Sequence, residues 1–204
     1  VYGGLSKVFA GIVIAPIGGI IFGLLITTLI ITIFATKRPG PVNKTFGRLQ
    51  IISSAWFALT HGANDGQKTM GIIALILFSS GMIPELDIPV WVIFAAAAAM
   101  GLGTFFGGYK VIKTLGVKIT RLKPYQGFAA ETGGGIMLAA FAVLGIPAST
   151  THAITGTIMG SGAARRKRAV RWKVSRQIVF SWIITIPGAA GLGIGFTYLI
   201  HLFV

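Results

Sequence analysis

The sequence predicts an all-α polytopic membrane protein. Of its 204 residues 54% are hydrophobic and only 11% are charged, whereas soluble domains are about 25% charged. The mean hydropathy is +0.83, and the apolar residues form runs long enough to span a bilayer as helices. Short stretches rich in Lys and Arg separate these runs. The net charge of +14 therefore indicates membrane topology, and we expect no nucleic-acid partner.

The first three apolar segments alternate with charged connections. The segments lie at residues 8–34, 50–80 and 90–109. The connections at 37–48 and 110–123 are basic, whereas the one between the second and third segments carries Glu85 and Asp87 and no Lys or Arg. Cytoplasmic loops carry an excess of Lys and Arg. We therefore expect both basic connections in the cytoplasm and the acidic connection outside.

The rest of the sequence predicts a helical hairpin and a last span. Residues 124–164 are apolar and lie between the basic stretches 110–123 and 165–173, so both of their ends should face the cytoplasm. This requires a hairpin, either re-entrant or fully spanning, with its tip at 146–151. Residues 174–204 then form the last span. We expect a single multi-pass transmembrane domain over residues 1–204, in the lipid bilayer of the plasma or inner membrane.

Glycine spacing predicts close packing between helices. The chain contains 29 glycines, several of them four residues apart. Small residues at this spacing let transmembrane helices approach closely. We expect a packing role for three pairs: Gly103 and Gly107, Gly156 and Gly160, Gly191 and Gly195.

The stretch "THGANDGQKTMG", residues 60–71, places polar side chains inside an apolar segment. An Asp at the centre of a membrane helix costs about 2.5–3.5 kcal/mol, and glycine loosens the backbone. We therefore expect a broken helix here, with freed carbonyls and the Asp65 carboxylate facing a polar cavity. The alternative is a structural salt bridge between Asp65 and Lys68. The neighbouring Asn64 adds a polar group that a simple pair would not need.

Three hydroxyl residues follow Pro147 at the predicted hairpin tip: Ser149, Thr150 and Thr151. One of them would suffice to cap the next helix. Three hydroxyls together with the positive end of a helix suit an oxyanion such as phosphate or sulfate. The tip is therefore either an anion site or a helix cap.

Glu131 lies about 10 Å into the membrane if the helix begins at Pro124. A glutamate at this depth is protonated, paired or an ion ligand. The hydroxyl of Thr132 and backbone exposed by the glycines at 133–135 could complete a cation site of oxygens. The alternative is a neutral glutamate hydrogen-bonded between helices.

Two histidines, His61 and His152, lie beside the polar motifs. We expect hydrogen-bonded supports, with proton carriage as the alternative. The chain has no cysteine, so a thiolate metal site is excluded. It also lacks a His-Glu-x-x-His motif and a nucleophile elbow, which argues against an intramembrane enzyme. We expect no organic cofactor.

These motifs resemble those of the inorganic phosphate transporter (PiT) family. "HGANDGQKTMG" resembles its GAND motif, and "GIPASTTHAITGTIMGSGAARR" is similar to its Pro-x-Ser-Thr-Thr-His motif. "FAAETGGG" lies where the family carries an intramembrane glutamate. Order and spacing agree from about residue 50 to 204. Family members have two inverted halves, each bearing the motifs, whereas this chain has one copy. The resemblance therefore implies the C-terminal half of a longer transporter, with the N-terminal repeat as its partner.

The resemblance also implies a function. It implies a symporter of inorganic phosphate coupled to H⁺ or Na⁺, with a sulfate permease as the alternative, and it leaves a homodimer open. Where many members read Val-Ala-Asn-Ala after GAND, Lys68 replaces the Asn, which keeps proton coupling open beside sodium. The implied roles are substrate binding by Asn64, Asp65, Ser149, Thr150 and Thr151, cation coupling by Asp65, Asn64 and Glu131, with any Na⁺ at Asp65 or Glu131, and modulation by Lys68, His61 and His152.

Overall fold

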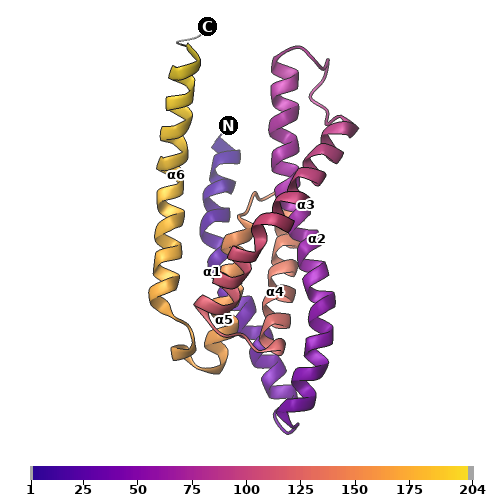
Figure 1. Ribbon diagram of the computed structural model, residues 1–204, viewed down its shortest axis with the longest axis vertical. Coiled ribbons are helices and arrows are strands. Elements are labelled where there is room, and N and C mark those ends of the chain that lie inside the picture. The colour runs from indigo at the N-terminus through magenta and orange to yellow at the C-terminus, as the bar shows by residue number, and fades with distance from the viewer. Residues whose placement is uncertain (1, 202–204) are drawn as a thin grey trace. The chain divides into compact units, whose positions relative to one another are not determined.

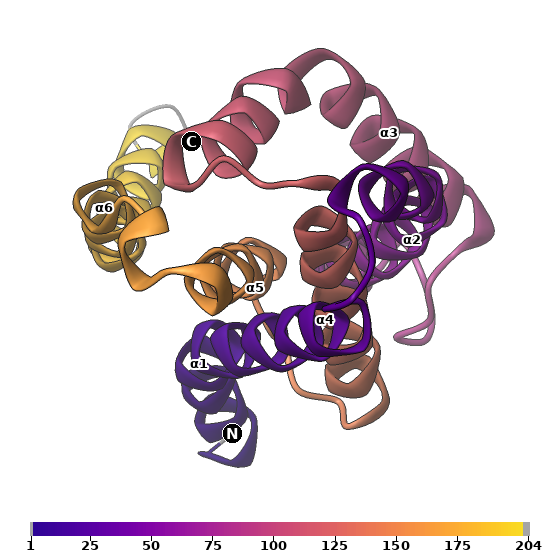
Figure 2. The same ribbon diagram turned by 90° about the horizontal axis from the view of Figure 1, so that it is seen from below.

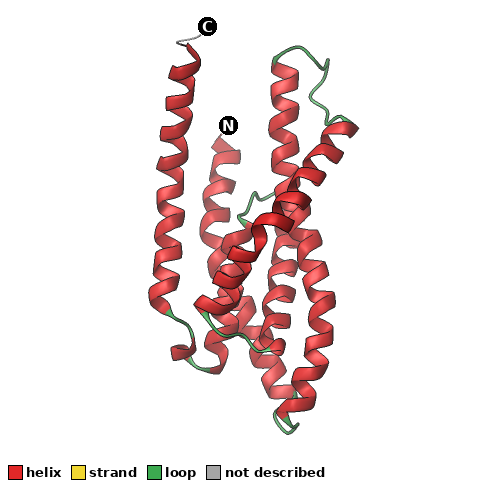
Figure 3. Ribbon diagram, in the orientation of Figure 1, coloured by secondary structure: helices red, strands yellow, loops and turns green. Residues whose placement is uncertain are grey.

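The computed structural model describes residues 2–201, which form helices joined by loops, with no strand among them (Figure 3). The predicted all-α class is confirmed. Within residues 2–201, three helices are long and apolar enough to cross a membrane, at Ser6–Ile33, Val90–Tyr109 and Trp172–His201. The chain forms two compact units, Val1–Val170 and Arg171–Val204, which are described separately. The single domain over residues 1–204 stays a prediction.

The first unit is built from helices that surround a hairpin. Its described elements are α1 (Tyr2–Ile33), α2 (Pro39–Ser79), α3 (Val90–Lys113), the π-helix η1 (Thr114–Ile119), α4 (Pro124–Val143), α5 (Thr150–Arg165) and the 3₁₀ helix η2 (Lys167–Ala169). Helices α4 and α5 form the hairpin and pack on each other (Figures 1 and 2). Helix α1 packs against both, and α2 packs against α4 and α3.

The basic connections are shorter than predicted, because helices extend into them. The predicted loop at 37–48 is wrong from Pro39 onward, where α2 begins. Proline suits the first helical turn, since its missing N–H would have no intrahelical partner there. Further along α2, Phe46 packs in the core, with its ring centroid 5.4 Å from that of Phe34. Likewise, η1 and η2 occupy much of the predicted loops 110–123 and 165–173.

The charged connections of the first unit segregate to two ends. In Figure 1 the α1–α2 and η1–α4 connections lie toward the lower end of the unit, and the α2–α3 connection lies at its upper end. Glu85 and Asp87 are exposed in that upper connection. This segregation agrees with the pattern expected from the positive-inside rule. The orientation in the membrane stays a prediction.

A cysteine-labelling experiment tests that orientation. In a cysteine-free version of the full-length protein, Glu85→Cys should react with a membrane-impermeant maleimide in intact cells. Arg168→Cys should react only after permeabilisation, because residues 165–173 are expected in the cytoplasm. Labelling of position 168 in intact cells would contradict the topology.

Helix α2 runs without a break through residues 60–71, so the predicted unwinding is wrong. The polar groups find partners without leaving the helix. The hydroxyls of Thr60 and Thr69 donate to carbonyls of α2 itself, and the side chains of Asn64 and Asp65 bond to the hairpin. Since these side chains contact protein groups instead of lipid, the backbone does not have to open to satisfy them.

The hairpin turns at residues 144–149, about halfway up the unit in Figure 1. Helix α4 ends in a Schellman motif, in which Ile146 N–H donates to Phe141 O at 2.9 Å and Gly145 N–H to Ala142 O at 3.2 Å. Gly145 has φ +59°, a conformation that glycine adopts without strain. Helix α2 continues for about 20 Å past Asp65, which lies at the tip. This geometry fits the re-entrant alternative.

Helices α1 and α5 cross closely at four glycines. A Cβ on Gly19 would lie 2.6 Å from Ala153 O, and one on Gly23 would lie 2.9 Å from Ser161 N. A Cβ on Gly156 or Gly160 would meet the α1 backbone in the same way. The predicted packing role of Gly156 and Gly160 is confirmed. The other two predicted pairs face open space among the described residues, so their packing role stays a prediction.

The second unit contains one described helix, α6 (Trp172–His201). Pro187 lies inside it, and it matches the predicted last span. Residues 202–204 of that span lie outside the described residues.

Candidate functional site

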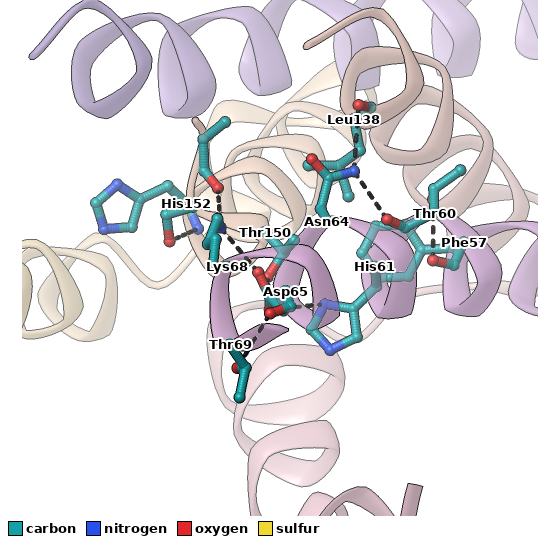
Figure 4. Close-up of polar contacts among 12 residues, drawn as sticks. Phe57, Thr60, His61, Asn64, Asp65, Lys68, Thr69, Leu138, Thr150 and His152 are labelled. Carbon is teal, nitrogen blue, oxygen red and sulfur yellow. Dashed lines mark hydrogen bonds and ion pairs between the residues drawn. The ribbon is translucent and has the colours of Figure 1, made fainter. Parts of the chain in front are cut away.

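Asp65 lies at the centre of a polar cluster where α2 meets the hairpin tip (Figure 4). One carboxylate oxygen, Oδ1, accepts from Lys68 Nζ at 2.9 Å. The other, Oδ2, accepts from Thr150 Oγ1 at 2.8 Å and lies 3.4 Å from His61 Nδ1. Asp65 therefore connects α2 to the first turn of α5.

Lys68 extends this cluster to the chain between the hairpin helices. Its Nζ donates to Ala148 O at 2.6 Å as well as to Asp65. The Asp65–Lys68 salt bridge named as an alternative is present, but it is one part of a larger network. That network bonds α2 to the tip through the Thr150 hydroxyl, which donates to Asp65, and through the Ala148 carbonyl, which accepts from Lys68.

Asn64 faces the hairpin and is 7% exposed. Its amide Nδ2 donates to Thr60 O at 2.8 Å and to Leu138 O at 3.3 Å. Both amide protons are therefore used in bonds to α2 and α4, and only the amide oxygen remains. The geometry favours Asn64 as a side chain that holds α2 against α4.

The three hydroxyls of the tip have three different environments. Ser149 caps α5, since its Oγ accepts from His152 N at 3.3 Å. The Thr150 hydroxyl donates to Asp65. Thr151 is exposed and has no hydrogen-bond partner in the described part of the chain. The backbone N–H groups of Thr150 and Thr151, first in the helix, have no intrahelical acceptor. Donors for an anion therefore remain at Thr151 and at these two N–H groups.

The two histidines differ in position. His61 lies beside Asp65 and stacks on Phe57, with ring centroids 6.1 Å apart. His152 points away from Asp65 in Figure 4 and contacts the backbone of Ile12 in α1. Only His61 belongs to the Asp65 cluster.

A second polar cluster surrounds Glu131. Its Oε2 accepts from Ser53 Oγ at 2.6 Å, and its Oε1 accepts from Gln50 Nε2 at 3.2 Å. Both partners belong to α2, as expected for a glutamate hydrogen-bonded between helices. The sequence reasoning missed these two residues. Their signal was a pair of polar side chains three residues apart, on one face of a helix.

The glycines that follow Glu131 serve packing. A Cβ on Gly133 would lie 3.2 Å from Phe22 of α1, and one on Gly134 would lie 3.0 Å from Phe57 of α2. Gly135 would meet Trp56 in the same way. The predicted exposure of backbone to an ion at these glycines is therefore wrong, because aromatic side chains cover them.

A cavity of about 820 Å³ joins the two clusters. It lies between α2, α3, α4 and α5, and most of its lining is apolar. His61 and Thr151 line it near the hairpin tip, and Gln50 and Glu131 line it near the start of α4. An aqueous or substrate path between the two clusters has room here.

Asp65 and Glu131 are too far apart to bind one ion. Ser53, which contacts Glu131, precedes Asp65 by about 18 Å along α2 at 1.5 Å per residue. Among the described residues no three His, Asp or Glu side chains gather as metal ligands. A coupling ion would therefore occupy one carboxylate or the other.

Comparison with known proteins gives consistent matches. The model of a family described as "Phosphate transporter family" matches residues 34–193. A "Probable low-affinity inorganic phosphate transporter" of Rhizobium meliloti is 50% identical over 93% of this chain and 57% of its own length. One with the same description from Bacillus subtilis is 38% identical over 94% of this chain and 58% of its own length. The chain thus spans about half the length of these relatives.

A solved structure is similar as well. The protein described as "The sodium-dependent phosphate transporter" is 27% identical, with a TM-score of 0.63 over 85% of this chain and 52% of that one. The similarity extends to the fold, and again covers about half of the larger protein.

Proposed function

The chain belongs to the phosphate transporter family, a family of transporters and not of enzymes, and from this premise we propose that it forms one half of a symporter for inorganic phosphate. The other half is the N-terminal repeat of the same transporter, and the membrane is the plasma or inner membrane. The observation that carries the proposal is the first turn of α5. There, the unpaired donors of Thr151 follow Thr150, which donates to Asp65, at a hairpin tip that ends part-way along α2.

Phosphate is bound in this proposal by the start of α5. The N–H groups of Thr150 and Thr151 and the positive end of the helix attract an oxyanion. The hydroxyls of Ser149 and Thr151 donate to it. Asp65 still has free lone pairs, so it accepts from a protonated phosphate oxygen. Sulfate carries no such proton at neutral pH, which favours phosphate over sulfate.

The coupling cation is H⁺ or Na⁺ in this proposal. Glu131 is one candidate for its binding group, because the carboxylate borders the cavity and its partners Ser53 and Gln50 are uncharged. Asp65 is the other candidate, with Asn64 holding α2 in place. A sodium-dependent relative supports cation coupling but does not choose between the two ions.

An uptake experiment tests the function. Full-length protein containing this chain is reconstituted in vesicles, and uptake of radiolabelled phosphate is measured. A sodium gradient at constant pH and a pH gradient without sodium are applied separately. We expect saturable uptake that one gradient drives and that a large excess of sulfate does not inhibit. Uptake that follows neither gradient, or equal inhibition by sulfate and phosphate, would contradict the proposal.

Thr151→Val tests the anion site. Loss of a hydroxyl that donates to a charged oxyanion should cost about 1.5–3 kcal/mol, which is roughly ten- to a hundredfold in phosphate affinity. The melting temperature should stay unchanged, since this hydroxyl has no partner in the described part of the chain. Thr150→Val should instead lower the melting temperature, because it removes the bond to Asp65.

The matched control is Thr155→Val, one turn further along α5. Thr155 is fully buried and its Oγ1 has no hydrogen-bond partner among the described residues, so neither affinity nor stability should fall. If Thr151→Val lowers the melting temperature but not the phosphate affinity, the Thr151 hydroxyl only stabilises the fold and phosphate binds elsewhere.

A further inference from the structure

We propose that Lys68 is a built-in cation. Its ammonium group permanently occupies the position at Asp65 that a dissolved cation would otherwise take, so that phosphate binding in this half needs no sodium ion there. The inference rests on the proposed function, and it assigns the coupling ion to the other carboxylate.

The surroundings of Lys68 Nζ resemble those of a bound cation. Its two neighbours are Asp65 Oδ1 at 2.9 Å and Ala148 O at 2.6 Å. Carboxylate and backbone carbonyl oxygens are the ligands that hard cations prefer in proteins. They come from separate elements, α2 and the chain between α4 and α5. One positive charge therefore holds together two oxygens that would otherwise be left without a charged partner.

Asp65 needs this charge because its other contacts do not supply it. Thr150 donates a neutral hydrogen bond to Oδ2, and His61 carries a charge only when it is protonated. A carboxylate in an apolar helix is costly without a counter-charge. Without a counter-charge, the Asp65 carboxylate would also repel a phosphate anion at the start of α5. The ammonium group offsets both effects.

Lys68 also keeps one donor free. An ammonium group has three N–H bonds, and two are used by Asp65 and Ala148. The side chain is 41% exposed, so the third N–H is accessible beside the donors of α5. The same group can therefore compensate Asp65 and attract the anion.

The two carboxylates then have different roles. A charge that is covalently attached cannot leave with the substrate, so Asp65 does not release a coupling ion. Glu131 has no cationic partner in the described part of the chain, only Ser53 and Gln50. Glu131 is accordingly the carboxylate that binds and releases the coupling cation.

The sodium dependence of phosphate binding tests this inference. Binding of radiolabelled phosphate to purified full-length protein is measured in sodium chloride and in choline chloride at constant ionic strength. In choline, Lys68→Gln should bind phosphate at least about tenfold more weakly than the wild type, the loss expected for one charge-assisted hydrogen bond. Sodium should restore the phosphate affinity of Lys68→Gln. This variant should also bind one more sodium ion per phosphate than the wild type does. Lys68→Arg, which keeps the charge, should show the wild-type number.

Two results would overturn the inference. One is the same sodium dependence in Lys68→Gln as in the wild type. The other is a loss of binding in Lys68→Gln that sodium does not restore, which would make Lys68 a direct phosphate ligand only.

Thermal melting without phosphate gives an independent readout. Sodium, but not choline, should raise the melting temperature of Lys68→Gln, and this rise should be absent from the double variant Asp65→Asn, Lys68→Gln. Equal responses to the two salts would overturn the inference. If the wild type binds no phosphate at all, the proposed function fails, and melting still decides the role of Lys68.

Discussion

Gly160→Ala is expected to destabilise the protein by about 3 kcal/mol, the upper part of the range for overpacked cores. The added methyl group would lie 2.9 Å from Leu24 N and would also meet the Ile20 carbonyl. Both obstacles are backbone atoms of α1, which cannot rotate away as a side chain could. The helices would have to separate, and the contacts of the whole crossing would weaken.

The melting temperature of purified full-length protein measures this effect. Gly101→Ala in α3 is the matched control, because a Cβ there meets nothing within 4 Å in the described chain. Alanine is a better helix former than glycine by about 1 kcal/mol, so the control should be neutral or slightly stabilising. Similar losses in both variants would show that the close α1–α5 crossing does not exist.

Glu131→Gln is expected to abolish net phosphate uptake and to leave the protein folded. The side-chain shape is retained, but the amide can neither ionise nor bind a cation as a carboxylate does. It also offers one acceptor oxygen where Glu131 offers two, one each for Ser53 and Gln50. A modest fall in melting temperature should therefore accompany a complete loss of transport. Uptake in reconstituted vesicles and melting of the same preparation measure the two effects.

Ser53→Ala is the control for Glu131→Gln. It removes the 2.6 Å hydrogen bond to Glu131 and leaves the carboxylate in place. Uptake should be reduced but measurable, with a loss of stability similar to that of the glutamine variant. Near-normal uptake by Glu131→Gln would mean that Glu131 only bonds the helices together and that the coupling ion binds elsewhere.

The sequence was sufficient for the helices, because an apolar run of about 20 residues can satisfy its backbone in a membrane only as a helix. The sequence was not sufficient to predict that α2 is an unbroken helix through residues 60–71. The prediction of a broken helix counted the cost of Asp65 in lipid, but Lys68 supplies a counter-charge one turn away, and the hydrogen-bond donor Thr150 lies 85 residues away along the chain. The partner of Asn64 on α4 lies 74 residues away. Local pattern contains no information on such distant contacts.

For the candidate site too, some features could be predicted from the sequence and others could not. The residues with unusual chemistry, Asp65, Lys68, Glu131 and Thr151, were all found because polar groups are rare in an apolar sequence. The sequence did not predict which role each of these residues has, because that depends on which hydrogen-bond donors are already bonded within the protein. Ser53 and Gln50 were missed because their contacts with Glu131 span 78 and 81 residues of sequence.

The continuity of α2 also has a mechanical consequence. Because α2 is a continuous helix between Ser53 and Asp65, this stretch of about 18 Å can tilt as a rigid body about the contact between Ser53 and Glu131. A tilt of about 10° would swing Asp65 by about 3 Å over that length. A displacement of this size away from α5 would break the 2.8 Å hydrogen bond between Thr150 and Asp65. Such a tilt would also have to break the bonds of Lys68 to Ala148 and of Asn64 to Leu138 before the hairpin tip is released from α2, whereas the bonds at Glu131 could stay formed.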